Sequence, residues 1–301
     1  MATNQGFKSL IPGPEIDASY LYYWLRANRP MLESLGNGAT FKELSKKTVE
    51  QLEVPVPPIQ EQRRIAAILD HADALRAKRH QVLAHFDDLT QSIFHDMFGR
   101  FRDWRWPTVA VREAGAVKLG RQRSPKYQTG KWPRPYLRVA NVQMDWLKLD
   151  DVLTMDFDPK DYGAYRLEYG DVLLNEGQNT EFVGRPAMWR DEIDGCCFQN
   201  TLVRFSPDRD RVTPEFALHV FLEFLRTGQF ARISSKTSNV AHLGKERFAA
   251  MAMPLPPLEM QTAFSSAVTA IRLQRERAVE ACATGDELFA SLQSRAFTGE
   301  L

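Results

Sequence analysis

Cysteine is scarce in this chain of 301 residues. Its three cysteines are Cys196, Cys197 and Cys282, and two of them are adjacent. Adjacent cysteines suit neither an intrachain bridge nor the spacing of structural zinc sites, which excludes a disulfide framework. The sequence also lacks a long apolar run and a basic N-terminal segment followed by one. These absences predict a protein of the reducing cytoplasm that is neither exported nor inserted in a membrane.

Sequence signatures of several enzyme classes are absent as well. The chain has no Gly-x-Gly-x-x-Gly loop, and Gly130 and Lys131 lack the earlier glycine of a phosphate-binding loop. It has no Asp/Asn-Pro-Pro-aromatic tetrapeptide, which is typical of amino-methyltransferases. Asp171, Glu176 and Gln178 are spaced as in a nuclease metal site that has lost its lysine, and a strand followed by a turn explains them better. We therefore expect no catalytic residues, no metal site and no cofactor bound by this chain.

The chain does contain a long-range repeat. Residues 44–62 (LSKKTVEQLEVPVPPIQEQ) return as residues 243–261 (LGKERFAAMAMPLPPLEMQ), and the match continues into the segments that follow. A repeat spacing of about 200 residues favours a duplicated domain and linker over a solenoid. The chain length is that of about two domains.

Each cluster of prolines precedes a segment with helical periodicity. Proline fixes its own backbone torsion and biases the preceding residue away from helix, so each cluster ends a domain and begins a connector. Residues 60–98 contain neither proline nor glycine, and residues 259–296 carry a thinner apolar stripe rich in small side chains. We expect two long helices that pair as an antiparallel coiled coil, with separate surface helices as the alternative. The expected seam consists of Ile65, Ile68, Ala72, Leu75, Val82, Phe86, Leu89 and Ile93 in the first helix and of Phe264, Ile271, Ala278, Leu288 and Leu292 in the second.

The region between these helices, residues 104–253, reads as short apolar or alternating runs separated by turn residues. One helix is expected at residues 214–225, because Thr213 is a good cap and Pro214 suits the first turn. The expected fold class is α+β, with a strand-rich domain flanked by two long helices.

The net charge of +1 conceals an uneven distribution along the chain. Residues 100–150 contain twelve Lys and Arg against four acids, whereas residues 151–220 contain fourteen acids and seven bases. A basic segment beside aromatic and amide side chains is typical of a polyanion-binding surface. A solvated charged surface is the alternative.

Several motifs, taken in order, resemble those of the specificity subunit of type I restriction-modification systems. They are residues 55–79 (PVPPIQEQRRIAAILDHADALRAKR), 135–143 (PYLRVANVQ), 169–177 (YGDVLLNEG), 183–189 (VGRPAMW), 197–200 (CFQN) and 292–301 (LQSRAFTGEL). The resemblance implies target recognition domains that contact double-stranded DNA and antiparallel helices that space them and dock modification subunits. It also implies a non-catalytic chain that directs a methyltransferase, which would use S-adenosylmethionine, and a restriction/translocase subunit to a target site.

The chain departs from the full-length pattern of that family in one respect. We expect residues 1–54 to be the C-terminal remnant of a first recognition domain, and residues 55–99 to be the central helix. Residues 100–253 would be a complete recognition domain, and residues 254–301 the distal helix. Such a chain would read one half-site, or form a homodimer and read a palindrome. The alternatives are an adaptor that binds modification subunits without specific DNA binding and, as a minor one, a self-contained DNA-modifying enzyme.

The strongest candidate for DNA contact is the segment 120–132 (GRQRSPKYQTGKW), which combines cations and amides on a loop that contains proline and glycine. Arg and Lys bind phosphates or guanine, and Gln pairs with adenine. A loop that makes only nonspecific contacts is the alternative, and for Asn141 a structural role in a turn is another. The predicted contacts are Arg121, Gln122, Arg123, Ser124, Lys126, Tyr127 and Lys131 in this segment, and Arg138, Asn141, Gln143, Gln178, Asn179, Arg185, Lys236, Ser238 and Asn239 outside it.

Overall fold

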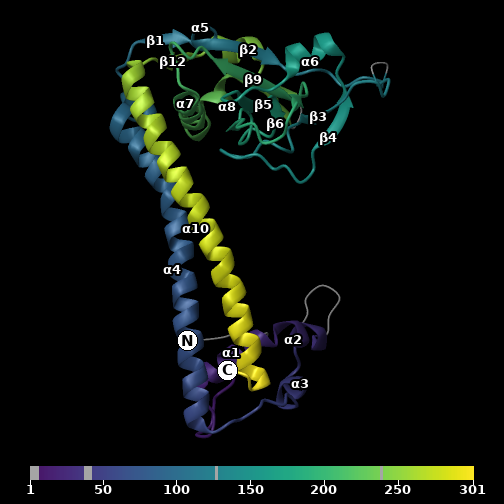
Figure 1. Ribbon diagram of the computed structural model, residues 1–301, viewed down its shortest axis with the longest axis vertical. Coiled ribbons are helices and arrows are strands. Elements are labelled where there is room, and N and C mark those ends of the chain that lie inside the picture. Colours follow the sequence, from purple (N-terminus) through teal and green to yellow (C-terminus); the bar gives the residue numbers. More distant parts are fainter. Residues whose placement is uncertain (1–6, 37–42, 126–127, 238–239) are drawn as a thin grey trace. The chain divides into compact units, whose positions relative to one another are not determined.

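The computed structural model describes residues 7–36, 43–125, 128–237 and 240–301 (Figure 1). The chain divides into two compact units. Residues 1–87 and 273–301 form the first unit, and residues 88–272 form the second.

Two long helices contribute residues to both units. Helix α4 (Ile59–Phe98) and helix α10 (Leu258–Thr298) confirm the helices predicted from the sequence. Helix α4 begins directly after Pro58, and Gly99 ends it in a left-handed conformation with φ of 83°. Gly299, with φ of 81°, follows α10 in the same way. None of the described helices combines the length and the apolar character that crossing a bilayer requires.

The first unit packs short helices against parts of α4 and α10. The short helices are α1 (Ala18–Ala27), α2 (Arg29–Leu35) and α3 (Lys46–Glu50). In Figure 1 the purple α1 lies beside the yellow end of α10, where the rings of Tyr20 and Phe297 meet edge to face with centroids 5.4 Å apart. The core of this unit consists of Tyr20, Tyr23, Ile65, Ala66, Leu69, Phe289 and Ala296.

Within this unit α4 and α10 run antiparallel. The Arg64 guanidinium donates to the Leu301 carbonyl at 2.6 Å, and that of Arg79 donates to the Ala281 carbonyl at 3.0 Å. Positions that advance along α4 therefore meet positions that recede along α10, which confirms the predicted antiparallel pairing.

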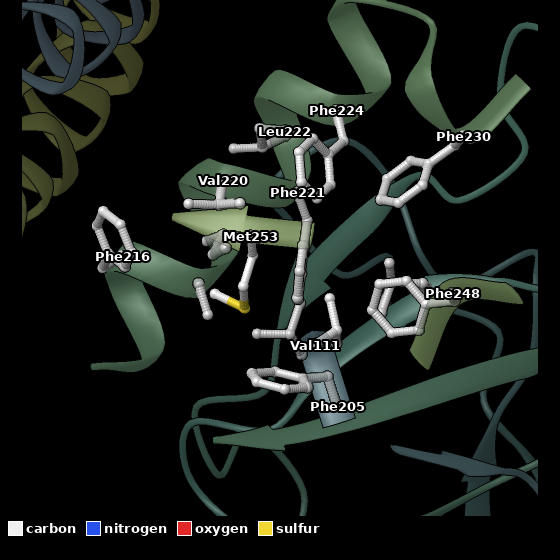
Figure 2. Packing of buried hydrophobic residues seen from close by; sticks show 14 of the residues in the cluster. Val111, Phe205, Phe216, Val220, Phe221, Leu222, Phe224, Phe230, Phe248 and Met253 are labelled. Atoms are coloured by element: carbon white, nitrogen blue, oxygen red, sulfur yellow. The ribbon is translucent and has the colours of Figure 1, made fainter. Parts of the chain in front are cut away.

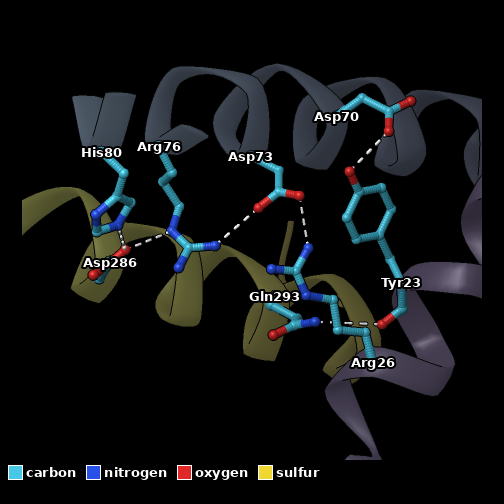
Figure 3. Close-up of polar contacts among 8 residues, drawn as sticks. All are labelled: Tyr23, Arg26, Asp70, Asp73, Arg76, His80, Asp286 and Gln293. Atoms are coloured by element: carbon cyan, nitrogen blue, oxygen red, sulfur yellow. Dashed lines mark hydrogen bonds and ion pairs between the residues drawn. The ribbon is translucent and has the colours of Figure 1, made fainter. Parts of the chain in front are cut away.

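A chain of ion pairs joins the helices of the first unit (Figure 3). Asp73 of α4 accepts hydrogen bonds from Arg26 of α1 at 2.7 Å and from Arg76 at 2.8 Å. Arg76 also donates to Asp286 of α10 at 2.7 Å. The hydrogen bond from Arg26 holds the pKa of Asp73 below its usual value. Asp73 is therefore a bridge that keeps α1 on the α4–α10 pair.

The predicted seam between the long helices is only partly buried. Ile65 and Phe264 are buried, and Ile68, Ala72, Phe86, Ile93, Ile271, Ala278 and Leu292 are partly buried. The expectation that pairing covers the whole seam is wrong, because the exposed fractions of Leu75, Val82, Leu89 and Leu288 are 44%, 50%, 44% and 57%. Burial on α4 is concentrated at residues 65–69, where α1 also packs, and at residues 94–98, where a helix of the second unit packs. Two helices without a third neighbour leave part of each apolar face open to water.

The second unit is mixed and contains most of the strands, as predicted. Its strands are β1 (Thr108–Ala110), β2 (Gly115–Leu119), β3 (Pro133–Leu137), β4 (Leu153–Asp156), β5 (Val172–Asn175), β6 (Gly177–Gln178), β7 (Pro186–Met188), β8 (Cys197–Phe198), β9 (Leu202–Pro207), β10 (Ser235–Thr237), β11 (Val240–His242) and β12 (Ala252–Pro254). Its shorter helices are η1 (Phe101–Asp103), α5 (Val111–Ala114), α6 (Pro159–Tyr165), α7 (Pro214–Arg226), α8 (Gln229–Ile233) and α9 (Lys245–Ala249). Helix α7 confirms the helix expected at residues 214–225.

The described strands of the second unit form small sheets. Strands β2, β9, β5 and β7 make an antiparallel sheet in that order. Strands β4, β3 and β8 make another, in which β3 and β8 are parallel. Strand β11 joins β10 to β6, and β1 pairs with β12.

Helix α7 is the centre of the core of the second unit (Figure 2). Phe221 of α7 packs edge to face on Phe205 of β9 at 5.2 Å and on Phe248 of α9 at 5.1 Å between centroids. At the start of α7, Phe216 packs on Phe98 of α4 at 4.8 Å. The same helix therefore holds the sheet on one side and the end of α4 on the other.

The repeat seen in the sequence is also a repeat in three dimensions, centred on two buried glutamines. In the first unit, Oε1 of Gln62 accepts the backbone N–H of Asp17, the cap of α1, at 2.8 Å. Its Nε2 donates to the carbonyls of Glu15 and Pro57 at 2.9 and 2.7 Å. Gln62 is fully buried, and its one amide forms hydrogen bonds with three backbone groups.

Gln261 repeats this arrangement in the second unit. Its Oε1 accepts the backbone N–H of Thr213, the cap of α7, at 3.0 Å. Its Nε2 donates to the carbonyls of Arg211 and Pro256 at 3.0 and 2.9 Å. Helices α1 and α7 are thus equivalent, and each is joined to a long helix by the same glutamine clamp.

Replacing either clamp glutamine by alanine is expected to destabilise its own unit. Gln62→Ala or Gln261→Ala removes three hydrogen bonds that a buried amide makes to one backbone N–H and two carbonyls, which costs about 1–3 kcal/mol. Urea unfolding of the full chain measures the loss. Gln60→Ala is the matched control, because Gln60 is exposed on the same helix as Gln62. Equal stability of the Gln62→Ala and Gln60→Ala variants would contradict the clamp.

Candidate functional site

The basic loop, residues 120–132, leaves the sheet after β2 and enters β3. Arg121 stands at its first end and is only 8% exposed. Its Nε donates to Asp161 at 2.5 Å, and its Nη1 donates to the Asp156 carbonyl at 3.0 Å. The guanidinium also lies over the ring of Phe157, 5.4 Å from its centroid. Arg121, a predicted DNA contact, is therefore committed to holding the loop, because its donors are used inside the protein.

Asp156 holds the other end of the basic loop. Its carboxylate accepts the backbone N–H groups of Thr129, Gly130 and Trp132, and also the Thr129 hydroxyl at 2.9 Å. Removal from water alone would raise the pKa of Asp156, but the hydrogen bonds from Thr129, Gly130 and Trp132 lower it below its usual value. The carboxylate is thus charged at neutral pH and acts as an anchor.

Between its anchored ends the basic loop presents polar side chains to water. Gln122, Arg123 and Lys131 are exposed, and Ser124 is half-buried. Lys126 and Tyr127 lie outside the described residues. A loop fixed at both ends presents its cations at low entropic cost, which suits the binding of phosphates.

A second set of predicted residues lies in the Asn141 turn, residues 138–143. Asn141 is only 1% exposed. Its Oδ1 accepts the N–H of Arg138 at 3.0 Å, and its Nδ2 donates to the carbonyls of Lys148 and Asp151 at 2.9 and 3.1 Å. These hydrogen bonds give Asn141 a structural role in the turn, and its contact with DNA stays a prediction.

The other members of this turn remain nearer the surface. Arg138 forms an ion pair with Asp151 at 2.5 Å, and Gln143 donates to the Ala140 carbonyl at 3.0 Å. Beyond the turn, Trp146 is 54% exposed. An exposed indole beside amide and cationic groups offers a stacking surface for a planar ligand.

A third set gathers on the small sheet formed by β10, β11 and β6. Gln178 of β6 pairs with Ala241 of β11, and Lys236 of β10 pairs with the same residue from the other side. Residues about 60 positions apart in the sequence are thereby brought together. Next to them, Nδ1 of His242 and the Glu176 carboxylate lie within hydrogen-bond distance, 2.9 Å apart. Ser238 and Asn239, which follow β10 in the sequence, lie outside the described residues.

The remaining predicted contacts adjoin this sheet. The Oδ1 of Asn179 accepts the N–H of Phe182 at 3.0 Å, which makes it a turn residue. The Arg185 guanidinium lies over the Phe182 ring, 5.3 Å from the centroid, and its burial lowers the pKa of Arg185.

The segment between β8 and β9 ties the basic loop to the Asn141 turn. The N–H of Gln199 donates to the carbonyl of Leu137 at 2.9 Å, and the N–H of Asn200 donates to the carbonyl of Arg121 at 3.0 Å. A β-carbon on Gly120 would stand 2.1 Å from the Gln199 carbonyl oxygen, so the two backbones approach this closely only because residue 120 is glycine.

Thr201 extends the same junction to the small sheet. Its hydroxyl accepts the N–H of Val139 at 3.2 Å, and its carbonyl accepts the N–H of Glu176 at 2.9 Å. The three sets of predicted residues therefore meet at one backbone junction, residues 199–201. Sequence reasoning missed this junction and Asp156, because their partners are backbone groups that no side-chain pattern reveals.

A second feature lies in the first unit, where α4 and α10 leave an apolar groove of about 550 Å³. Its apolar lining consists of Ala67, Ile68, Ala72, Leu75, Leu288, Phe289 and Leu292, and Arg64, His71, Arg76 and Arg79 also line the groove. These include predicted seam residues, so part of the seam lines an open groove instead of a closed interface. Among the described residues, no cluster of three or more His, Cys, Asp or Glu side chains is placed to hold a metal ion.

Comparisons with known proteins agree on one family. The model of the type I restriction modification DNA specificity domain matches residues 1–85. The chain is 22% identical over 277 residues to the MjaVIII specificity subunit of Methanocaldococcus jannaschii, covering 85% of this chain and 64% of that protein. It is 20% identical over 292 residues to the EcoKI specificity subunit of Escherichia coli, covering 91% and 63%. The chain thus spans less than two thirds of the length of these relatives.

Solved structures show the same fold. The HsdS subunit from Thermoanaerobacter tengcongensis aligns with a TM-score of 0.52 at 20% identity, covering 94% of this chain and 70% of that one. The S subunit of a type I restriction-modification system from M. genitalium aligns with a TM-score of 0.58 at 14% identity, covering 94% and 73%.

Replacing Asp156 by asparagine is expected to loosen the basic loop. The amide carries no charge and turns donors toward the loop N–H groups, so the backbone amides of Thr129, Gly130 and Trp132 should exchange with solvent faster by roughly an order of magnitude. Hydrogen exchange of the full chain measures this. Asp150→Asn is the control, because Asp150 is exposed and lies outside the loop. If the loop amides of the Asp156→Asn variant exchange as slowly as those of the wild type, Asp156 does not anchor the loop.

Proposed function

We propose that this chain is a specificity protein of the type I restriction-modification family and that it recognises a target sequence in double-stranded DNA. In this proposal the chain directs methyltransferase and restriction/translocase subunits to that site. The main support is the junction at residues 199–201, which gathers cationic and amide side chains from three distant segments on the second unit. Loops held on a rigid scaffold are where such binding is built.

The residues divide by chemistry into those that bind phosphate and those that read bases. Arg123 and Lys131 are exposed on the anchored basic loop and suit phosphates. Gln122 and Gln178 carry amides that match the edge of adenine. Arg121 and Asn141 support these residues from beneath.

The chain itself performs no chemical step in this proposal. The relatives are named as specificity subunits, and the methyl group would come from S-adenosylmethionine bound by the partner methyltransferase. The three cysteines are free, which fits a cytoplasmic complex.

The apolar groove of the first unit is the proposed docking surface for modification subunits. Leu75 and Leu288 line it and are 44% and 57% exposed, although both are large apolar side chains. An open apolar groove between two helices accepts the apolar face of another helix. An adaptor that docks through this groove without reading DNA is the second candidate, supported by the size of the groove.

The proposed function predicts a new methylation motif in cells. Expression of the full chain with a type I modification subunit should methylate one sequence motif, detected by sequencing modified bases in the genome. An asymmetric bipartite motif would mean two different readers, and a palindrome would mean a homodimer that reads the same half-site twice. Methylation at sites that share no motif would contradict the proposed DNA recognition and favour the adaptor. The absence of methylation while the two subunits still copurify would do the same.

The docking proposal predicts that charge in the groove separates the subunits. Leu75→Asp or Leu288→Asp places a carboxylate in the apolar wall and should weaken binding of the modification subunit by about tenfold or more. Copurification and titration of the two proteins measure this. Val279→Asp is the matched control, because Val279 is an equally exposed apolar residue of α10 outside the groove. Equal loss in both variants would show a helix defect and overturn the docking site.

A further inference from the structure

The second unit carries a group of cations that none of the predicted contacts includes. Lys118 lies on β2, Arg204 on β9, Arg166 directly after α6, and Arg134 on β3. They come from four separate segments, and only Lys118 and Arg134 belong to the basic stretch at residues 100–150.

Contacts place these cations in one continuous row. Lys118 and Arg204 are direct partners in the pairing of β2 and β9. Arg204 donates to the Arg166 carbonyl at 2.7 Å. Arg166 and Arg134 both lie over the ring of Tyr162, with guanidinium carbons 6.0 and 4.5 Å from its centroid. We name Lys118, Arg134, Tyr162 and Arg166 the cation–tyrosine band.

Aromatic rings orient the band. The Lys118 ammonium lies 4.6 Å from the centroid of Tyr165, and the hydrogen bond with Tyr162 raises the pKa of Arg166. A guanidinium stacked on a ring keeps its N–H edge free to donate while its plane is held in place. Arg134 and Arg166 are both exposed to solvent.

Acidic partners do not neutralise the whole row. Arg204 is 14% exposed and pairs with Asp171 at 3.4 Å, and Arg166 pairs with Glu168 at 3.4 Å in an exposed position. Within the described part of the chain, neither Lys118 nor Arg134 has an acidic group within 4 Å. Like charges opposite each other in a sheet, such as Lys118 and Arg204, cost stability.

The pKa shifts of two neighbouring groups have cationic causes. Burial and the nearby Arg204 lower the pKa of Lys118, and Asp161 acts in the opposite direction. Burial raises the pKa of the Cys197 thiol to about 12, while Arg134, Arg204, Arg121 and Arg166 all act in the opposite direction. Cationic side chains therefore outnumber acidic ones among the charged groups that act on Lys118 and Cys197.

We propose that the cation–tyrosine band binds consecutive phosphates of the DNA backbone, with Lys118, Arg134 and Arg166 as the contacts and Tyr162 as the residue that positions the two arginines. This site rests on the proposed function and deepens it. A row of oriented cations suits an extended polyanion, whereas a single ion would need donors that converge on one point. Phosphate contacts hold the protein in register on the duplex, and the base reading stays with the loop amides.

The test is a salt titration of duplex binding by the full chain. Fluorescence anisotropy with a random-sequence duplex is followed from about 50 to 200 mM salt, and each phosphate contact contributes roughly 0.9 to the slope of log K against log salt. Lys118→Gln, Arg134→Gln and Arg166→Gln should each lower the slope by about one unit, equally for all sequences. Arg134→Lys should keep the slope, because it keeps the charge.

Two further variants separate charge from position. Tyr162→Leu removes the stacking ring and retains both arginines, so affinity should fall while the slope is kept. Arg277→Gln removes an exposed charge from α10 in the first unit and should change neither. If the wild-type chain binds DNA and the band variants have the same slope of log K against log salt, the phosphate site is wrong and the proposed DNA recognition is unaffected. If the wild-type chain and its complex with a modification subunit both fail to bind DNA, the proposed function falls, and the band with it.

Discussion

The buried glutamine clamp is the interaction on which both units depend. Gln62 and Gln261 each stand four residues beyond a proline pair, where a long helix has just begun and the chain before it has just ended. One amide satisfies a cap N–H and two carbonyls at each place. Without it three backbone groups in each unit would lose this hydrogen-bond partner, so the clamp ties α1 to α4 and α7 to α10.

Within the second unit, the clamp indirectly supports the candidate site. Gln261 holds the cap of α7, and α7 carries the core on which β9 packs through Phe205 and Phe221. Strand β9 begins at Leu202, directly after the junction at residues 199–201. A packed core is needed here, because a junction made of single backbone hydrogen bonds keeps its geometry only on a rigid support.

The two units present surfaces of opposite chemistry. The second unit exposes cations held by carboxylates and aromatic rings, such as Arg134 on Tyr162, which suits a polyanion. The first unit exposes apolar side chains along a groove, such as Leu75 and Leu288, which suits another protein.

The sequence by itself determined the long helices, the α+β class, the repeat and the basic loop, because each is written in local composition or periodicity. Tertiary structure alone decided which polar residues are free. Arg121 and Asn141 were predicted from the sequence to contact DNA. In the structure the Arg121 side chain donates to Asp161 and the Asn141 side chain donates to backbone carbonyls. Leu75 and Leu288 fit a heptad but stay open, because burial needs a third neighbour that periodicity does not specify. The cation–tyrosine band was invisible for the same physical reason: its members meet only when four distant segments fold together.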